Sequence, residues 1–124
     1  MITDPYNDEV RRLFADPAHA GTVDDGVVVR EEGQGVRIEF SARISGGSVA
    51  TLRFRAWGCP HVIAAAETVC RLLEGKSTAD LEVFVAAQIL EPLGIPIEKT
   101  GRILVIEDAV RSLARALTDT QMTT

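Results

Sequence analysis

Residues 52–73 read LRFRAWGCPHVIAAAETVCRLL, and this stretch decides the fold. Residues 52–57 alternate apolar and polar side chains, which predicts a β-strand with one buried face. From residue 62 the apolar side chains recur at spacings of three and four, which predicts a helix over residues 62–73. Pro60 suits the first turn of that helix, where a missing N–H costs nothing. Cys59 is therefore expected at a strand-to-helix turn, just outside the N-terminus of a helix.

This position favours thiol chemistry at Cys59. A helix N-terminus has unpaired N–H groups and a partial positive charge, so a thiol there loses its proton more readily. The thiolate is the form that attacks electrophiles or binds metal. Cys70 falls on the apolar stripe of the same helix and is expected to be buried. The two cysteines are separated by roughly 16 Å along the helix, too far for a disulfide, so both are predicted to be reduced.

The rest of the chain follows a pattern of strands and then helices. Strands are predicted at residues 27–30, 36–44 and 49–57, with glycines suited to a hairpin turn at residues 46–47. Helices are predicted at residues 7–14, 83–90 and 102–117, with a shorter one beginning at Ser77 as N-cap. Residues 118–124 are expected to fray. This order indicates an α+β domain, with helices on one face of a small antiparallel sheet.

Composition and charge exclude several classes of protein. A length of 124 residues with 46% hydrophobic content predicts one domain spanning residues 1–124. The net charge of −5, without a large basic patch, argues against nucleic acid as the main partner. No apolar run approaches the roughly 18 residues of a membrane span. The first residues are polar and acidic, unlike a signal peptide, so a cytoplasmic location is expected.

Three segments together resemble the U-type iron–sulfur cluster assembly scaffolds IscU, SufU and the N-terminal domain of NifU. They are the strand–Gly-Cys–helix junction at residues 57–61 followed by EGKS at 74–77, the EDA sequence at 107–109, and DPAHAG at 16–21. The resemblance covers nearly the whole chain in order. It implies a three-stranded antiparallel sheet packed against helices, the SufE/NifU-like fold.

The family binds an iron–sulfur cluster, or zinc in its place, through three cysteines, with an aspartate that tunes the site. By resemblance, Cys59 corresponds to the middle cysteine and is the sole retained ligand. Glu32 stands in place of the first cysteine, and Gln34 in place of the aspartate. Arg102 replaces the third cysteine, and Gly101 the histidine before it.

These replacements change the chemistry expected at the site. Iron and zinc sites favour several thiolates, so Cys59 alone cannot hold a cluster within one chain. Glu32 through oxygen and His61 through nitrogen are further candidate ligands, although His61 is expected to face outward on the helix. Arg102 cannot ligate because its guanidinium stays protonated. If the family fold holds, Glu32, Cys59 and Arg102 converge; we expect Glu32 and Arg102 to pair, and Arg102 to stabilise the thiolate.

Two segments are candidate partner contacts. The sequence IPIEK at residues 95–99 partly matches the family's chaperone-binding Leu-Pro-Pro-Val-Lys motif, which makes Lys99 a candidate partner-binding residue. Arg53, Arg55 and Trp57 share one face of the predicted strand. That face is either solvated, covered by a helix, or a stripe that binds a partner.

Three functions fit these observations. The first is a non-enzymatic scaffold-like protein of cluster assembly with a degenerate site, where Cys59 accepts persulfide sulfur from a cysteine desulfurase. A homodimer lending two copies of Cys59 would be needed to hold metal. The second is a metal-free module that docks on a desulfurase or another assembly protein and regulates it. The third is a thiol enzyme with His61 as base, which requires the two side chains to be within hydrogen-bond reach.

Overall fold

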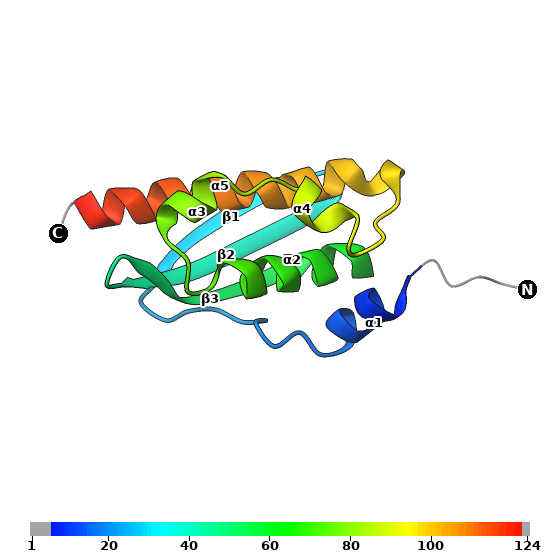
Figure 1. Ribbon diagram of the computed structural model, residues 1–124, viewed down its shortest axis with the longest axis horizontal. Helices are drawn as coiled ribbons and strands as arrows, with labels where there is room; N and C mark the ends of the chain where they lie inside the picture. Colours follow the sequence, from blue (N-terminus) through cyan, green and yellow to red (C-terminus); the bar gives the residue numbers. More distant parts are fainter. Residues whose placement is uncertain (1–5, 123–124) are drawn as a thin grey trace, which may run out of the picture.

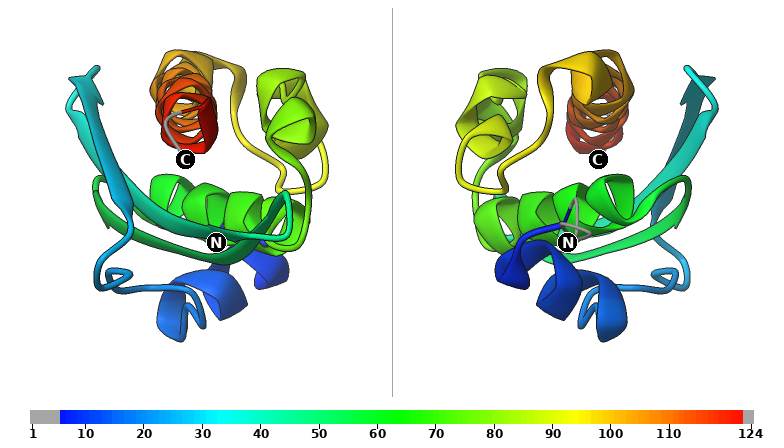
Figure 2. Two further views of the ribbon diagram at one scale, coloured as in Figure 1. Left: turned by 90° about the vertical axis from the view of Figure 1, so that its left-hand side faces the viewer. Right: turned by 90° about the vertical axis from the view of Figure 1, so that its right-hand side faces the viewer.

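The computed structural model describes residues 6–122, in which three strands precede most of the helical residues (Figure 1). Strands β1 (Val27–Gly33), β2 (Val36–Ser45) and β3 (Ser48–Trp57) form one antiparallel sheet in the order β1-β2-β3. The sheet is curved, and helices α2 (Pro60–Leu73) and α5 (Thr100–Met122) lie on its concave side (Figure 2). The predicted fold class, an α+β domain with a three-stranded antiparallel sheet, is therefore confirmed.

The strand alternation sorts side chains onto two faces. On β2 the even-numbered positions are Val36, Ile38, Phe40 and Ala42, and all are buried beneath the helices. The intervening Arg37, Glu39 and Ser41 belong to the outer face. The turn between β1 and β2 consists of Gln34 and Gly35, both with positive φ, which suits a tight two-residue hairpin. This turn lets β1 extend to Gly33, three residues beyond the predicted end at residue 30.

The helices begin largely where local signals place them. Asn7 caps α1 (Asp8–Ala15) by accepting a hydrogen bond from the Val10 N–H at 2.8 Å. The predicted N-cap Ser77 opens α3 (Thr78–Glu82), and with Asp80 it forms a reciprocal capping box. Helix α5 begins after a short 3-10 turn, η1 (Ile97–Lys99), and continues to Met122. The expectation that residues 118–122 are frayed is therefore wrong, because they are helical. Residues 123–124 lie outside the described residues.

The helix predicted at residues 83–90 is shorter than expected. Only α4 (Ala87–Leu90) is helical, because α5 satisfies the backbone of the preceding residues. The Ala86 N–H donates to Glu107 Oε1 at 2.7 Å, and Arg111 donates to the Phe84 carbonyl at 3.0 Å. These bonds allow Phe84 to enter the core from a non-helical segment.

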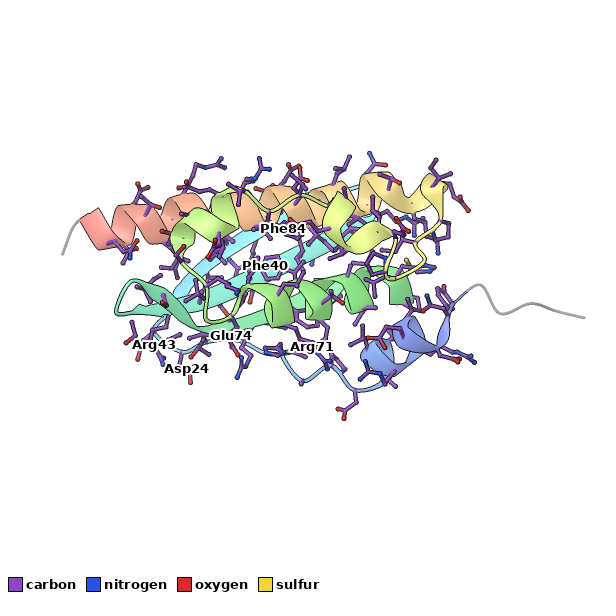
Figure 3. The ribbon with its side chains drawn as sticks, viewed as in Figure 1. Asp24, Phe40, Arg43, Arg71, Glu74 and Phe84 are labelled. Atoms are coloured by element: carbon purple, nitrogen blue, oxygen red, sulfur yellow. The ribbon has the colours of Figure 1, made fainter. Side chains whose placement is uncertain are left out.

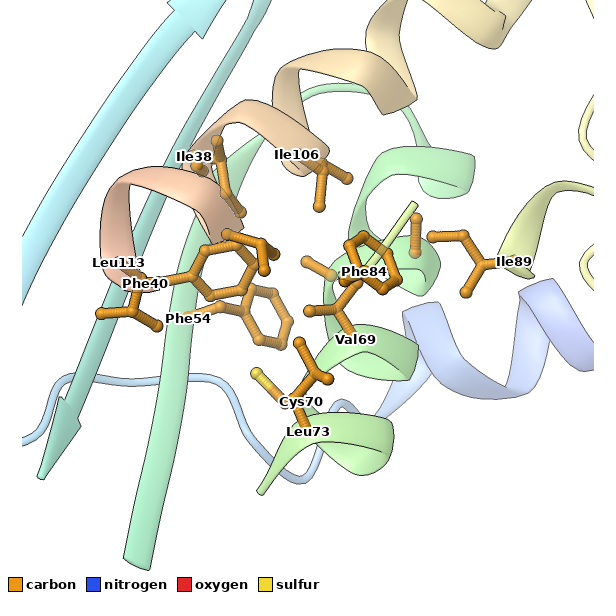
Figure 4. Packing of buried hydrophobic residues seen from close by; sticks show 14 of the residues in the cluster. Ile38, Phe40, Phe54, Val69, Cys70, Leu73, Phe84, Ile89, Ile106 and Leu113 are labelled. Carbon is orange, nitrogen blue, oxygen red and sulfur yellow. The ribbon is translucent and has the colours of Figure 1, made fainter. Parts of the chain in front are cut away.

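The core fills the space between the sheet and the helices (Figure 4). Phe40 and Phe54 from the sheet are buried together with Val69 of α2, Ile106 of α5 and Phe84. The starts of α2 and α5 lie at the same end of the molecule, on the right in Figure 1. Within residues 6–122, no helix combines the length and apolar character that crossing a membrane requires.

Candidate functional site

Cys59 is the N-cap residue of α2, immediately after β3. Its backbone is extended, with φ −78° and ψ 169°, and its carbonyl accepts the Val62 N–H at 2.9 Å. Pro60 occupies the first turn, as predicted. A Cβ on Gly58 would lie 3.1 Å from Val62, so a larger residue there would crowd the start of the helix. The strand end and the helix therefore hold the half-buried Cys59 thiol at a tight, well-defined corner.

Several groups around this thiol affect its pKa. Partial burial acts to raise the pKa of the Cys59 thiol. The Val62 N–H, the Arg102 side chain, the His61 N–H and the positive charge of Lys99 more than offset that effect, so the pKa of Cys59 is lowered. The expected stabilisation of the thiolate by Arg102 is therefore supported, and Lys99 adds to it.

His61 does not face outward, as the sequence pattern suggested, but is fully buried. Its Nδ1 lies 3.0 Å from Lys99 Nζ, and its ring is 4.6 Å from that of Tyr6. An ammonium group only donates, so Nδ1 accepts and the ring proton is on Nε2. Burial, with Lys99 and Arg102 nearby, lowers the pKa of His61. The sequence pattern missed this because Lys99 and Tyr6 reach the ring from distant segments.

The His61 geometry also bears on two of the proposed roles. Its Nε2 is buried without a hydrogen-bond partner among the described residues, and no hydrogen bond joins its side chain to Cys59 there. A thiol enzyme with His61 as general base lacks the required contact. Lys99, the candidate partner residue, is half-buried on His61 and lies 5.2 Å above the Tyr6 ring. The exposed side chains of that turn are Ile97, at 88%, and Glu98.

The predicted ion pair between Glu32 and Arg102 is wrong. Glu32 lies directly across from Arg37 in the β1–β2 register, and their side chains approach to 3.6 Å. Among the described residues, no carboxylate lies within ion-pair distance of Arg102. Arg102 instead acts on Cys59, where it lowers the pKa of the thiol. Glu32 pairs with Arg37 because the two residues face each other on neighbouring strands. This partner could be identified only once the β1–β2 register was known.

The loops that correspond to the family's ligand positions do come together. The side chain of Gln34, at the β1–β2 turn, lies 3.6 Å from the point where a Cβ on Gly101 would be. The first turn of α5 therefore lies against the β1–β2 hairpin. No group of three or more His, Cys, Asp or Glu side chains suited to a metal ion occurs within residues 6–122. The site combines one thiolate with two cations, a donor set that does not suit an iron–sulfur cluster or zinc.

The outer face of β3 is solvated beside this site. Trp57 is 45% exposed, with the guanidinium groups of Arg37 and Arg55 at 5.5 Å and 5.3 Å from its ring. Arg55 has no carboxylate within ion-pair distance among the described residues, whereas Arg53 pairs with Glu74 at 2.7 Å. Hollows open on both sides of Trp57. The helix-covered alternative for this strand face is therefore excluded.

A second polar cluster was not predicted from the sequence. Glu67 is fully buried and accepts two hydrogen bonds from His19, at 2.7 Å from its backbone N–H and 2.6 Å from Nδ1. Arg71 donates to the same carboxylate at 2.8 Å. These contacts lower the pKa of Glu67 although burial acts to raise it. The available signal was a lone carboxylate within the apolar run of residues 62–70.

Cys70 lies near this second cluster and behaves as the sequence predicted. It is fully buried and packs with the hydrophobic core (Figure 4). Burial, reinforced by the negative charges of Glu67 and Glu74, raises the pKa of Cys70 well above its usual value. A neutral, buried thiol is unreactive, so Cys59 is the thiol available for chemistry.

Comparisons with known proteins agree with this architecture. Residues 5–122 match the profile of the NifU-like N terminal domain. The chain is 26% identical over 115 residues to "Iron sulfur cluster assembly protein 1, mitochondrial" of Eremothecium gossypii, covering 86% of this chain and 75% of that protein. It is 24% identical over 118 residues to "Iron-sulfur cluster assembly scaffold protein IscU" of Azotobacter vinelandii, covering 89% and 91%. The crystal structure of a NifU-like protein (N-terminal) from Brucella abortus matches with a TM-score of 0.73 at 14% identity, covering 91% and 94%.

Proposed function

Because the chain belongs to the NifU-like N-terminal domain family, we propose that it acts in iron–sulfur cluster assembly, as a scaffold-like protein that is not itself an enzyme. Its site is degenerate, and its task is to receive sulfur on Cys59 from a cysteine desulfurase. The observation that carries this proposal is the position of Cys59 as the N-cap of α2, where the Val62 N–H, Arg102 and Lys99 lower the pKa of the thiol and so favour the thiolate. The names of its relatives in cluster assembly support the pathway.

The side chains around Cys59 argue against a complete cluster in one chain. Such clusters are held by several thiolates, and here only Cys59 supplies one. Glu32 is occupied by Arg37, and His61 Nδ1 is occupied by Lys99. Arg102 brings a permanent positive charge to the position of a lost ligand. A negatively charged sulfur species fits this surrounding better than a cation does.

Sulfur transfer at Cys59 is a simple exchange. The Cys59 thiolate attacks the outer sulfur of a persulfide on the desulfurase. A new S–S bond forms at Cys59 as the donor's S–S bond breaks, and its electron pair leaves on the donor thiolate. The transferred sulfur keeps its proton and its oxidation state, so no oxidant is required. Arg102 and Lys99 would stabilise the thiolate before the attack.

The test is transfer from a purified cysteine desulfurase supplied with L-cysteine. Mass spectrometry should detect one added sulfur atom on Cys59 in the wild type and none in Cys59→Ser. Cys70 is the internal control and should remain unmodified. Persulfide on Cys70, or none on either cysteine while the desulfurase is active, would overturn the proposal.

Metal content tests the degenerate site directly. Iron, zinc and acid-labile sulfide should be far below one per chain in protein purified without oxygen, both in the wild type and in Cys59→Ala. Near-stoichiometric metal that disappears in Cys59→Ala would contradict this. It would mean that two chains each lend Cys59 to a shared site in a homodimer.

The second candidate function is a metal-free module that docks on a desulfurase or another assembly protein. The exposed Trp57, between Arg37 and Arg55, supports it, because aromatic and arginine side chains are enriched in interfaces. Binding that persists in Cys59→Ser but weakens at least about tenfold in Trp57→Ala would favour this function. Unchanged affinity in Trp57→Ala would exclude this surface, with Lys99 then the next residue to vary.

A further inference from the structure

A short segment after α1 runs along the free edge of the sheet. We call residues 17–22 the strap; they lie beside β3, the strand that has no further strand on that side. The Gly21 N–H donates to the Phe54 carbonyl at 2.8 Å, and the Phe54 N–H donates to the His19 carbonyl at 3.0 Å. These bonds form an isolated parallel bridge between Ala20 and Phe54. The strap therefore covers a strand edge that would otherwise be open to another chain.

Side chains hold the strap as well as its backbone: Thr22 Oγ1 donates to Glu39 at 3.5 Å, and His19 makes the shorter contact. The His19 imidazole lies between two carboxylates, with Nδ1 at 2.6 Å from Glu67 Oε2 and Nε2 at 3.3 Å from Glu74 Oε1. Figure 3 labels Arg71 and Glu74 on the side of α2 that faces the strap. Glu74 also accepts from the Leu52 N–H at 2.9 Å, which ties this group to β3.

This geometry depends on the protonation of His19. A neutral imidazole has one N–H, so it can donate to only one of two carboxylates, and its other nitrogen turns a lone pair toward the second. The imidazolium donates to both. The other charged groups facing the ring are Arg71 from α2 and Arg53 from β3, and each already pairs with one of the carboxylates. His19 is thus the only side chain linking Glu67 to Glu74 among the described ion pairs.

We propose that His19 is a protonation-dependent clasp: its imidazolium holds the strap on the edge of β3, and loss of the proton loosens the strap and uncovers that edge. An imidazole ordinarily changes charge between about pH 5 and 8, within the range that cells experience. The freed edge would present the backbone N–H and carbonyl of Phe54, which can pair with an added strand. The strap also lines the hollow beside Trp57, so its release would reshape that surface. The clasp is remote from Cys59 in sequence and does not depend on the function proposed for it.

Amide hydrogen exchange tests the clasp in the whole chain. The protection factors of the Gly21 and Phe54 amides, which are corrected for the intrinsic pH dependence of exchange, should fall about tenfold between pH 5.5 and 8, as expected for loss of a hydrogen bond to a charged group. The Val49 amide is the matched control. It is also on β3, but it donates to the Lys76 carbonyl at 2.8 Å and should keep its protection.

Two variants separate the clasp from general loosening. In His19→Gln the pH response of Gly21 and Phe54 should disappear. Glu74→Gln retains the Glu67 contact and should reduce the response without removing it, which keeps the test available if His19→Gln folds poorly. Nitrogen-15 chemical shifts of the ring should show both nitrogens protonated at pH 5.5. Equal protection at both pH values, a response that survives in His19→Gln, or a neutral ring at pH 5.5 would overturn the proposal.

Discussion

The two ends of helix α2 each carry a cysteine, in opposite electrostatic surroundings. At its start, Cys59 and His61 face the cations Lys99 and Arg102, and the pKa of each is lowered. Toward its end, Cys70 is buried beside carboxylates, and its pKa is raised. Cations and the helix N-terminus favour a thiolate, whereas buried carboxylates favour a neutral thiol.

The difference teaches that the helix supplies only part of the chemistry. The Val62 N–H at the start of α2 is the largest of the effects that lower the pKa of Cys59, and Arg102 and Lys99, beyond α2, add to it. Likewise, Glu67 is tolerated in a buried position because His19, on the strap, and Arg71 donate to it. Each end of α2 is therefore completed by a segment that is distant in sequence, and substitutions at either end should test this separately.

The largest effect is expected from Glu67→Ala. It would leave the half-buried N–H of His19 and the Arg71 guanidinium without their fully buried acceptor, and should lower the free energy of unfolding by about 3 kcal/mol. Urea denaturation measures this. Glu82→Ala, at an exposed position on α3, is the control and should change stability by less than about 0.5 kcal/mol. A loss below about 1 kcal/mol in Glu67→Ala would mean that the carboxylate does not organise this end of α2.

The free energy of unfolding should also depend on pH, and Glu67→Ala should weaken that dependence. The pKa values of Glu67 and Glu74 are lowered in the folded state, so their stabilisation is present above the unfolded pKa, near 4.3. It is lost as the pH falls through the lower folded values. Wild-type stability should therefore decline on acidification below about pH 4.3, and this decline should be shallower in Glu67→Ala.

The contrast between the two thiols gives the second prediction. Iodoacetamide at neutral pH should alkylate Cys59 at least about 100-fold faster than Cys70, because Cys59 is partly exposed and more readily ionised. Peptide mass spectrometry after timed quenching measures both rates in one sample. Denatured protein is the control and should react at similar rates at both positions. Comparable alkylation rates of Cys59 and Cys70 in the folded chain would show that the two ends of α2 do not differ in thiol reactivity.

A smaller effect is expected from Arg102→Gln, which removes one cation facing Cys59. The pKa of Cys59 should rise, so less thiolate is present at neutral pH and the alkylation profile moves to higher pH. The rate at pH 7 should fall about three- to tenfold. Arg115→Gln, farther along α5, is the matched control. A profile that does not move in Arg102→Gln would show that the helix N-terminus and Lys99 are sufficient.

Much of the fold was predictable because its signals are local. The alternation over residues 36–44, the glycines at 46–47 and the capping residue Ser77 each act within a few positions of the chain. The failures occurred where a distant segment replaced a local preference. Residues 83–86 are not helical because Glu107 and Arg111 bind their backbone. Local propensity could not reveal this, since the partners lie more than 20 positions away.

The site divides in the same way. The sequence by itself determined that Cys59 would stand at a helix N-terminus and that Cys70 would be buried. The family resemblance further implied that Glu32 and Arg102 stand in place of two ligand cysteines. Only the tertiary structure decided that Glu32 pairs with Arg37 and that Arg102 instead lowers the pKa of Cys59.

It also decided that His61 is buried against Lys99, and that His19 reaches Glu67 across 48 positions. The physical reason is that side-chain periodicity is set by the backbone over a few residues. Charge pairing and burial depend on distances in space, which exist only when the strap, the sheet and both long helices have packed together.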